Sequence, residues 1–128
     1  MTEDGIHLTG LVFYGYHGVQ PVEAELGQPF VVDVALTLPL RPAGRSDDLR
    51  HTVDYGAVYQ TVKDVVEGER YKLLEAVAER VAAVLLAQYP LRAVIVRVHK
   101  PRAPIKGAVF ASIAVEIRRS RDEQLPAL

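Results

Sequence analysis

The chain has 128 residues, 15 basic and 16 acidic side chains and a formal net charge of −1, so it is long enough for one hydrophobic core. This near balance of charge argues against a phosphate-backbone or charged membrane partner, and we expect neither nucleic acid nor membrane binding. The absence of cysteine excludes disulfides and thiolate nucleophiles. With no basic-then-apolar leader and no apolar run of ~18 residues, the sequence predicts a soluble cytoplasmic protein.

The first predicted element is a strand from Ile6 to Tyr14, in which Gly10 marks a bulge. It ends in Phe-Tyr-Gly-Tyr-His-Gly at 13–18, and an acidic stretch starting at Glu23 follows. Glycine lets the backbone bend and approach another surface closely, because it has no Cβ. Two interpretations are open: an aromatic turn that anchors a subunit or domain contact, or one wall of a small-molecule site with Glu23 on the loop beside it.

The second predicted strand has an apolar residue at every other position from Phe30 to Leu38. Segment 41–52 contains proline, glycine and a Ser-Asp-Asp run, which predict a connecting loop. Apolar residues then recur at helical spacing over 55–66 and again over 74–85. Gly68 is a stop signal for the first helix, and the second ends near Tyr89-Pro90.

Two more alternating strands follow, over 93–99 and 109–118. The order β-β-α-α-β-β predicts an α+β domain over residues 1–119, with a four-stranded antiparallel sheet and both helices on one face. Residues 120–128 are polar and predict a flexible C-terminal tail.

Two helices can cover only one side of such a sheet, yet the other side also carries apolar residues. These are Val31, Ala35, Ala93, Ile95, Phe110 and Ala114. Exposed apolar surface of this kind marks an association surface, and closing several sheets into a barrel would hide both the face and the sheet edges. We therefore expect a symmetric homo-oligomer.

Glu75 is the first candidate site residue, and it stands just after the start of the second helix, in Leu73-Leu74-Glu75. A carboxylate in the first turn of a helix is favoured by the helix dipole by ~0.3–1 kcal/mol, which alone could explain it. The alternative is that Glu75 accepts two N–H bonds from a flat, guanidine-like ligand edge, with backbone groups of Leu73 and Leu74 beside it.

Tyr55 and Lys100 are the other candidates. Thr52 or Asp54 could cap the first helix, with Tyr55 as its first core residue, or Tyr55 could stack on a planar ligand and present its hydroxyl. Lys100 ends the third strand, where a lysine is most often solvated. Pro101 stiffens the segment that follows, and rigid surroundings suit a positioned base.

The four histidines, at positions 7, 17, 51 and 99, have no metal-ligand spacing, so we expect no metal site and no cofactor. The sequence also lacks a phosphate-binding Gly-Lys loop, a dinucleotide-binding glycine turn and a nucleophilic serine elbow.

Five segments resemble the dihydroneopterin aldolase family. They are FYGYHG at 13–18, the Glu23 stretch running into GQPF at 27–30, TVDYG at 52–56, LLEAVAER at 73–80 and VRVHKPRAPIKG at 96–107. They lie in the order and spacing of that family from about residue 5 to residue 119. The resemblance implies a tunnelling fold, in which four-stranded units form a tetrameric ring around a barrel and two rings stack as an octamer.

The resemblance also implies a site between subunits, with Val53 and Tyr55 of one chain facing the remaining site residues of its neighbour. Those residues are Glu23, Leu73, Leu74, Glu75 and Lys100. The family's reaction splits 7,8-dihydroneopterin, a pterin, into 6-hydroxymethyl-7,8-dihydropterin and glycolaldehyde, often with epimerisation at C2′.

The resemblance assigns Lys100, Tyr55 and Glu23 to catalysis, and Glu75, Leu74, Leu73 and Val53 to substrate binding. Many aldolases use a lysine Schiff base or a zinc ion as electron acceptor. Dihydropterin has its own N5=C6 imine next to the breaking bond, so the resemblance implies a metal-independent retro-aldol cleavage.

Many members of the family have Ile-Pro-Gly where this chain has Ile105-Lys106-Gly107. The extra charge, together with Arg102, favours a first alternative: an epimerase of dihydroneopterin triphosphate on the same scaffold. A second alternative is a non-catalytic binding or assembly module. A third, metal-dependent pterin chemistry, would predict inhibition by chelators, which we do not expect.

Overall fold

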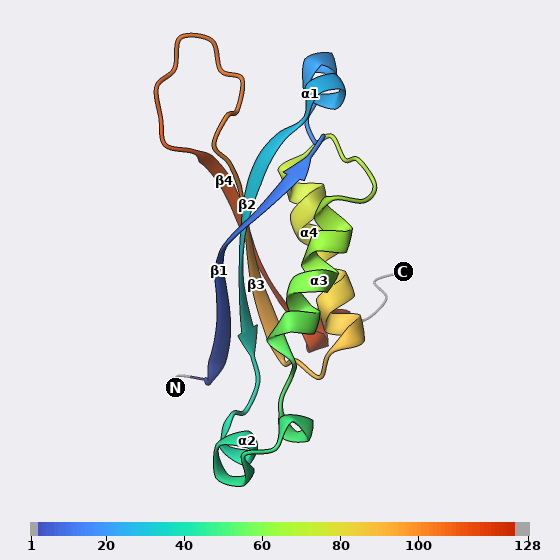
Figure 1. Ribbon diagram of the computed structural model, residues 1–128, viewed down its shortest axis with the longest axis vertical. Helices are drawn as coiled ribbons and strands as arrows, with labels where there is room; N and C mark the ends of the chain where they lie inside the picture. The colour runs from blue at the N-terminus through green and yellow to red at the C-terminus, as the bar shows by residue number, and fades with distance from the viewer. Residues whose placement is uncertain (1–2, 125–128) are drawn as a thin grey trace.

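The computed structural model describes residues 3–124 and has one layer of sheet and one layer of helices (Figure 1). The elements are β1 (Gly5–Gly15), α1 (Pro21–Leu26), β2 (Gln28–Thr37), α2 (Arg41–Ser46), η1 (Leu49–His51), α3 (Tyr55–Val66), α4 (Leu74–Gln88), β3 (Ala93–Lys100), β4 (Ile113–Ser120) and η2 (Arg121–Gln124). The strands form one antiparallel sheet in the order β1-β2-β3-β4. The predicted α+β class and β-β-α-α-β-β order of the main elements are confirmed.

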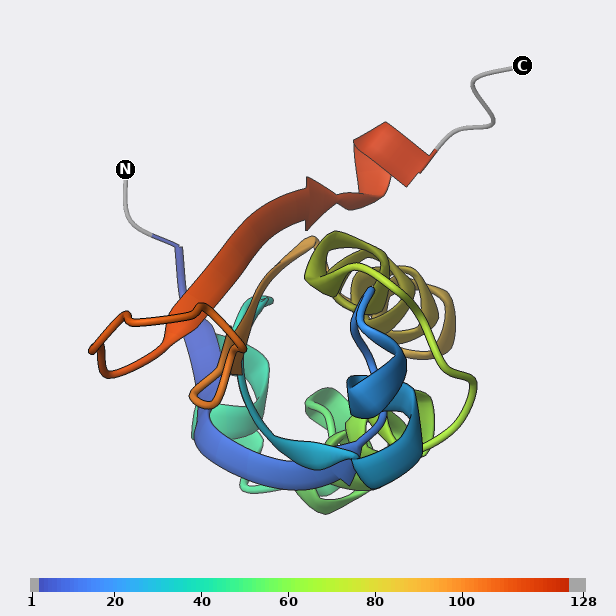
Figure 2. The same cartoon turned by 90° about the horizontal axis from the view of Figure 1, so that it is seen from above.

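The core lies between α3, α4 and the sheet, which curves around the two helices (Figure 2). Side chains of β2 alternate strictly between buried and half-buried, which confirms the period of two seen in the sequence. Burying one valine or leucine side chain completely stabilises the folded state by about 1.5–3 kcal/mol relative to leaving it exposed. The central side chains are Phe30, Val32, Val34, Leu36, Val58, Val62, Val77, Val81, Leu85, Val94, Val96 and Val98.

Gly10 forms the predicted bulge in β1. The pairing of β1 with β2 shifts between Leu8 and Leu11, and Gly10 has a φ of 71°, which favours glycine. The Gly10 N–H donates to Asp33 Oδ1 at 2.6 Å, so the extra residue is held by the neighbouring strand.

The fourth strand begins at Ile113, and the prediction that it begins at 109 is wrong. The last pair between β3 and β4 joins Lys100 to Ile113. Pro101 has no N–H to donate, so β3 cannot continue and residues 109–112 have no partner strand. Val109 is fully exposed in the resulting loop.

Two segments predicted as loops contain short helices. Glu23 lies on α1, which begins at Pro21, and segment 41–52 contains α2 and the 3-10 turn η1. Helices of three to six residues are too short to show an apolar periodicity, so the proline and glycine signals dominated the prediction.

The C-terminal segment is attached to the domain as far as Arg121. The Arg121 guanidinium donates to the carbonyls of Leu86, Tyr89 and Leu91 at 2.8–2.9 Å. Residues 125–128 of the predicted flexible tail lie outside the described residues.

The sheet face away from the helices remains partly open in the single chain. Val31, Ala35 and Ile95 are half-buried there, and Val12, paired with Val31, is 62% exposed. Strands β1 and β4 are both edges of the sheet. The association surface expected from the sequence therefore has the required apolar face and free edges, and it stays a prediction.

Candidate active site

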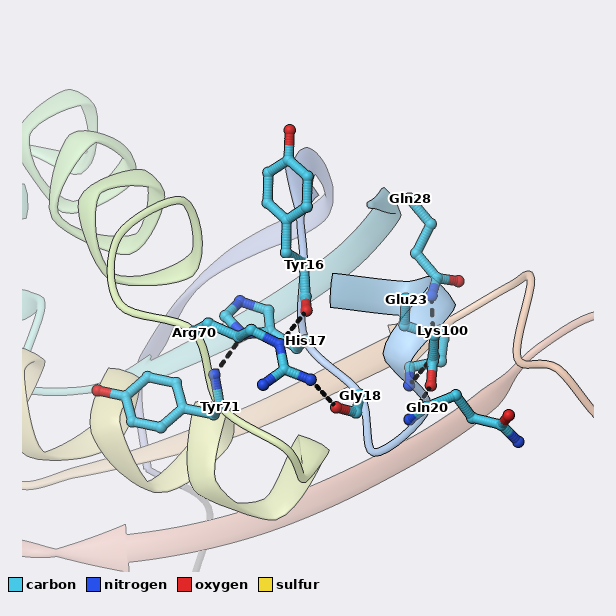
Figure 3. Close-up of polar contacts among 9 residues, drawn as sticks. All are labelled: Tyr16, His17, Gly18, Gln20, Glu23, Gln28, Arg70, Tyr71 and Lys100. Atoms are coloured by element: carbon cyan, nitrogen blue, oxygen red, sulfur yellow. Dashed lines mark hydrogen bonds and ion pairs between the residues drawn. The ribbon is translucent and has the colours of Figure 1, made fainter. Parts of the chain in front are cut away.

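A buried ion pair joins Lys100, the last residue of β3, to Glu23 on α1 (Figure 3). Lys100 Nζ donates to Glu23 Oε2 at 2.7 Å, and the two residues are 9% and 5% exposed. Lysine and glutamate are rarely buried unless they are paired. The interpretation of Lys100 as a solvated surface lysine is therefore wrong.

Three groups hold the Glu23 carboxylate in place. Besides Lys100, the Gln28 amide donates to Oε2 at 3.0 Å and the Gln20 N–H donates to Oε1 at 3.2 Å. Burial raises the pKa of Glu23, but the bonds from Lys100, Gln20 and Gln28 and the Lys100 charge outweigh it and leave that pKa below its usual range. Glu23 is therefore ionised at neutral pH. Gly18 lies against this carboxylate, because a Cβ at that position would overlap it.

Gln28 belongs to this site, although the sequence analysis did not single it out. It is 7% exposed, and its Oε1 has no hydrogen-bond partner among the described residues. A buried acceptor without a partner is unfavourable, and a contact with a bound ligand is one way to satisfy it. The signal in the sequence was its register, because Gln28 is the inward-facing position before Phe30, where an apolar residue is expected.

The aromatic turn at 13–18 supports α1. The Tyr14 hydroxyl donates to the Leu26 carbonyl at 2.5 Å, and the rings of Tyr14 and Tyr16 meet edge to face. Gly27 has a φ of 68°, and a Cβ there would lie 2.6–2.7 Å from both tyrosine rings. The turn therefore fixes the end of the helix that carries Glu23.

Leu73, Leu74 and Glu75 form the beginning of α4, as predicted. Leu73 is its N-cap residue, is 52% exposed and makes no side-chain cap. The first N–H groups of a helix have no partner within it, so those of Leu74 and Glu75 can bind a ligand. The Glu75 side chain is exposed and makes no hydrogen bond with the described part of the chain.

Tyr55 lies at the opposite end of the molecule from Glu23. It begins α3 near α2, whereas Val66 at the other end of α3 contacts the turn before α1 (Figure 1). Eleven residue steps separate Tyr55 from Val66, a rise of about 16 Å. Tyr55 is 68% exposed and is not a core residue, and Asp54 caps α3 through a 2.9 Å bond from the Gly56 N–H. Within one chain, Tyr55 does not approach Lys100.

Val53 is 5% exposed and packs in the core of its own chain, so its side chain presents little surface to a ligand.

The cavity beside Glu23 is small in the single chain. It has a volume of about 190 Å³ and is bordered by Gln28, Leu26 and, from the loop after β3, Arg102 and Pro104. Pockets for small molecules typically measure about 300–1,000 Å³. The cavity therefore offers one wall of a site rather than a complete one.

Neither a metal site nor a membrane span is evident between residues 3 and 124. No three His, Asp or Glu side chains of that range are grouped to bind a metal ion. No helix there is both long and apolar enough to cross a bilayer.

Replacing Glu23 with glutamine should lower the free energy of unfolding by about 3–5 kcal/mol at neutral pH, because Lys100 keeps its charge but loses its partner. Chemical denaturation at a fixed chain concentration measures this change. The control Glu25→Gln removes an exposed carboxylate from the same helix and should change stability by less than about 0.5 kcal/mol.

The same pair should make stability depend on acid. Because the pKa of Glu23 is depressed in the folded chain, its stabilisation is present above the ordinary value of 4.5 and is lost as pH falls further through the folded pKa. The difference between the unmutated chain and Glu23→Gln should therefore shrink below that pH. A constant difference would contradict an ionised Glu23.

Comparison with known proteins gives a consistent family. The family model described as dihydroneopterin aldolase matches residues 6–118. The chain is 49% identical over 118 residues to the dihydroneopterin aldolase of Streptomyces coelicolor, and the match covers 92% of this chain and 98% of that protein. It is 44% identical over 119 residues to the Bacillus subtilis enzyme of the same name, covering 92% and 98% of the two chains.

The fold is similar to solved structures of the same kind. The crystal structure of E. coli dihydroneopterin aldolase in complex with neopterin has a TM-score of 0.84 and 32% identity, and the match covers 91% of this chain and 99% of that one. A dihydroneopterin aldolase from Burkholderia thailendensis, bound to guanine, has a TM-score of 0.75 and 30% identity, covering 94% and 93%.

Proposed function

The chain belongs to the dihydroneopterin aldolase family, and from this membership we propose which of its residues carry out the reaction. The fold is the tunnelling fold, and the function is that of a lyase of folate biosynthesis, dihydroneopterin aldolase. Its reaction converts 7,8-dihydroneopterin into 6-hydroxymethyl-7,8-dihydropterin and glycolaldehyde.

Lys100 and Glu23 are the proposed acid–base pair. In the cleavage a side-chain hydroxyl loses its proton and becomes the carbonyl of glycolaldehyde, while the electrons of the broken C–C bond enter the N5=C6 imine. Lys100, through a water molecule, would move protons between this hydroxyl and N5. Glu23 would orient the ammonium group of Lys100. The 2.7 Å contact between Lys100 Nζ and Glu23 Oε2 and the burial of both residues support this role. The substrate accepts the electrons, so the mechanism requires no metal.

The beginning of α4 is the proposed site for the pterin ring. The Glu75 carboxylate would accept two N–H bonds from the N2/N3 edge of the ring, and backbone groups of Leu73 and Leu74 would complete the contact. Among residues 3–124, the Glu75 carboxylate and the first N–H groups of α4 have no hydrogen-bond partner, which supports this role. Neopterin and guanine, bound by the two similar structures, both have such an edge.

The complete site is proposed to lie between two copies of the chain. Tyr55 of a neighbouring copy would stack on the pterin and relay a proton, and the Val53 segment of that copy would border the ring. The separation of Tyr55 from Val66 by the length of α3 and the small cavity of the single chain support this arrangement. The free sheet edges and the open apolar face suit a ring of four chains, and two rings would give an octamer.

We also propose that the protein is cytoplasmic.

We propose epimerisation at C2′ as a second outcome of the same site, because glycolaldehyde that recombines through its other face yields the epimer. Dihydroneopterin triphosphate is a second candidate substrate, because Arg102 borders the cavity that contains Glu23. A non-catalytic binding module is disfavoured by the buried ion pair. Such a pair is a poor source of stability, so it favours a chemical role.

The contact of Lys100 with Glu23 is the single observation that carries the mechanism. Incubating the protein with 7,8-dihydroneopterin should release glycolaldehyde and 6-hydroxymethyl-7,8-dihydropterin in equal amounts, and a chelator should leave the rate unchanged. Parallel incubation with the triphosphate distinguishes the two substrates. A protein that epimerises the triphosphate but cleaves neither compound would contradict the aldolase assignment.

A further inference from the structure

Five hydrogen bonds join the turn at 16–18 to the segment at 66–71. Figure 3 shows those that Arg70 makes with this turn and the one between Tyr71 and His17. The Arg70 guanidinium donates to the Tyr16 carbonyl at 2.9 Å and to the Gly18 carbonyl at 2.6 Å. The His17 ring contacts the Val66 carbonyl at 2.7 Å and the Tyr71 N–H at 3.0 Å, and the Gly18 N–H donates to the Tyr71 carbonyl at 3.1 Å. We call the side chains of His17 and Arg70 the turn–loop clamp.

The His17 ring has one fixed hydrogen-bonding state in this clamp. It is 1% exposed, and the Tyr71 N–H can only donate, so Nδ1 accepts. Nε2 therefore carries the proton and donates to the Val66 carbonyl. Burial, with the positive charges of Lys100 and Arg70, lowers the pKa of His17, which keeps the ring neutral.

The clamp joins the two parts of the proposed site. The turn leads within five residues to Glu23, whose carboxylate holds Lys100. The loop leads within three residues of Tyr71 to the beginning of α4, where Glu75 lies. The chain passes through all of α1, β2 and α3 between turn and loop, so the spacing of the two parts depends on tertiary contacts. The bonds of the clamp are among these contacts, beside the packing of α4 on β3.

We propose that His17 and Arg70 are positioning residues for the cleavage: they set the distance between the pterin-binding end of α4 and the Glu23–Lys100 pair. This inference rests on the proposed function. A pterin bound at Glu75 reacts only when the hydroxylated side chain of the pterin lies next to Lys100. A displacement of the reacting groups by about 1 Å can reduce a rate by about 10². Bonds that hold a loop at both ends therefore affect turnover more than binding.

Arg70→Ala is the decisive variant. Arg70 is exposed, so its loss leaves no core cavity, and the backbone bond between Gly18 and Tyr71 remains. We expect kcat to fall about tenfold or more while the Kd of neopterin changes less than about threefold. Arg70→Lys keeps the charge but cannot serve both carbonyls well, and its kcat should be intermediate. The control Arg92→Ala removes an exposed arginine that forms a 3.4 Å ion pair with Glu3, and it should leave kcat unchanged.

His17→Phe tests the other half of the clamp. Phenylalanine can pack against Phe30 and Tyr71 as the imidazole does, but it makes neither hydrogen bond. We expect a lower Tm and a loss of kcat at least as large as that of Arg70→Ala. If this variant fails to fold, Arg70→Ala decides alone.

The assay of the unmutated protein separates this inference from the proposed function. A protein that releases glycolaldehyde, combined with an Arg70→Ala variant of unchanged kcat, would overturn the clamp and leave the function intact. A lower Tm with unchanged kcat, or a raised Kd with unchanged kcat, would likewise overturn it. Absence of glycolaldehyde from the unmutated protein would overturn both.

Discussion

Turnover of 7,8-dihydroneopterin should fall by about 10²–10⁴ when Lys100 is replaced by alanine, the range expected for the loss of a positioned acid–base group. The Kd of neopterin should change little, because the residues proposed to bind the pterin ring lie at the beginning of α4 and not on β3. Single-turnover kinetics, with binding measured separately, would distinguish the loss of chemistry from the loss of affinity.

The choice of variants matters, because Lys100→Ala leaves the Glu23 carboxylate buried without its cation. Lys100→Gln can still donate a hydrogen bond to Glu23, so it preserves the fold better while it removes the ionisable amine. Lys106→Ala is the matched control, because Lys106 is exposed on the loop after β3 and does not line the cavity beside Glu23. Turnover close to normal in Lys100→Gln would contradict an acid–base role for this lysine.

Mixing two inactive variants should restore activity if the site is shared between copies. Tyr55→Phe and Lys100→Gln would each be inactive alone, because every site would lack either the hydroxyl or the amine. When the two are unfolded together in equal amounts and refolded, roughly one contact in four would combine an intact Tyr55 with an intact Lys100. We therefore expect about a quarter of normal turnover per site.

A double variant provides the control for that experiment. Chains carrying both substitutions, refolded with unmutated chains in equal amounts, should also give roughly a quarter of normal activity. A mixture of the two single variants that remains inactive, while its chains assemble normally, would show that each chain supplies its own site. The separation of Tyr55 from Val66 by about 16 Å would then not indicate a site shared between copies.

Local patterns predicted the fold well, because the alternation in β2 and the apolar stripes of α3 and α4 arise from burial against one core. The bulge at Gly10 was predicted on a different ground, a glycine inside an alternating strand, and it is confirmed. The strand predicted to begin at 109 was wrong because an alternating pattern also occurs in a loop without a partner strand. A strand needs a paired neighbour, and β3 ends at Lys100, just before Pro101.

The site was less accessible to sequence reasoning than the fold. Glu23, Glu75, Lys100 and Tyr55 were singled out from local signals and the family resemblance, but no pattern shows that Glu23 and Lys100 touch across 77 residues. The role of His17 was not predicted, because its partner Val66 lies 49 residues away along the chain. For Gln28 the sequence offered only its inward-facing register before Phe30, which does not identify Glu23 as its partner. The burial of Lys100 likewise depends on α1, a helix too short to predict.

The distance in sequence between Glu23 and Lys100 has a consequence for how the chemistry arises during synthesis. The carboxylate leaves the ribosome early, but its cation follows only after both long helices have been made. Closing so long a segment costs entropy that the finished core must offset. A chain that ends before residue 100 therefore carries the carboxylate without its cation, and the ion pair can form only after β3 has been made.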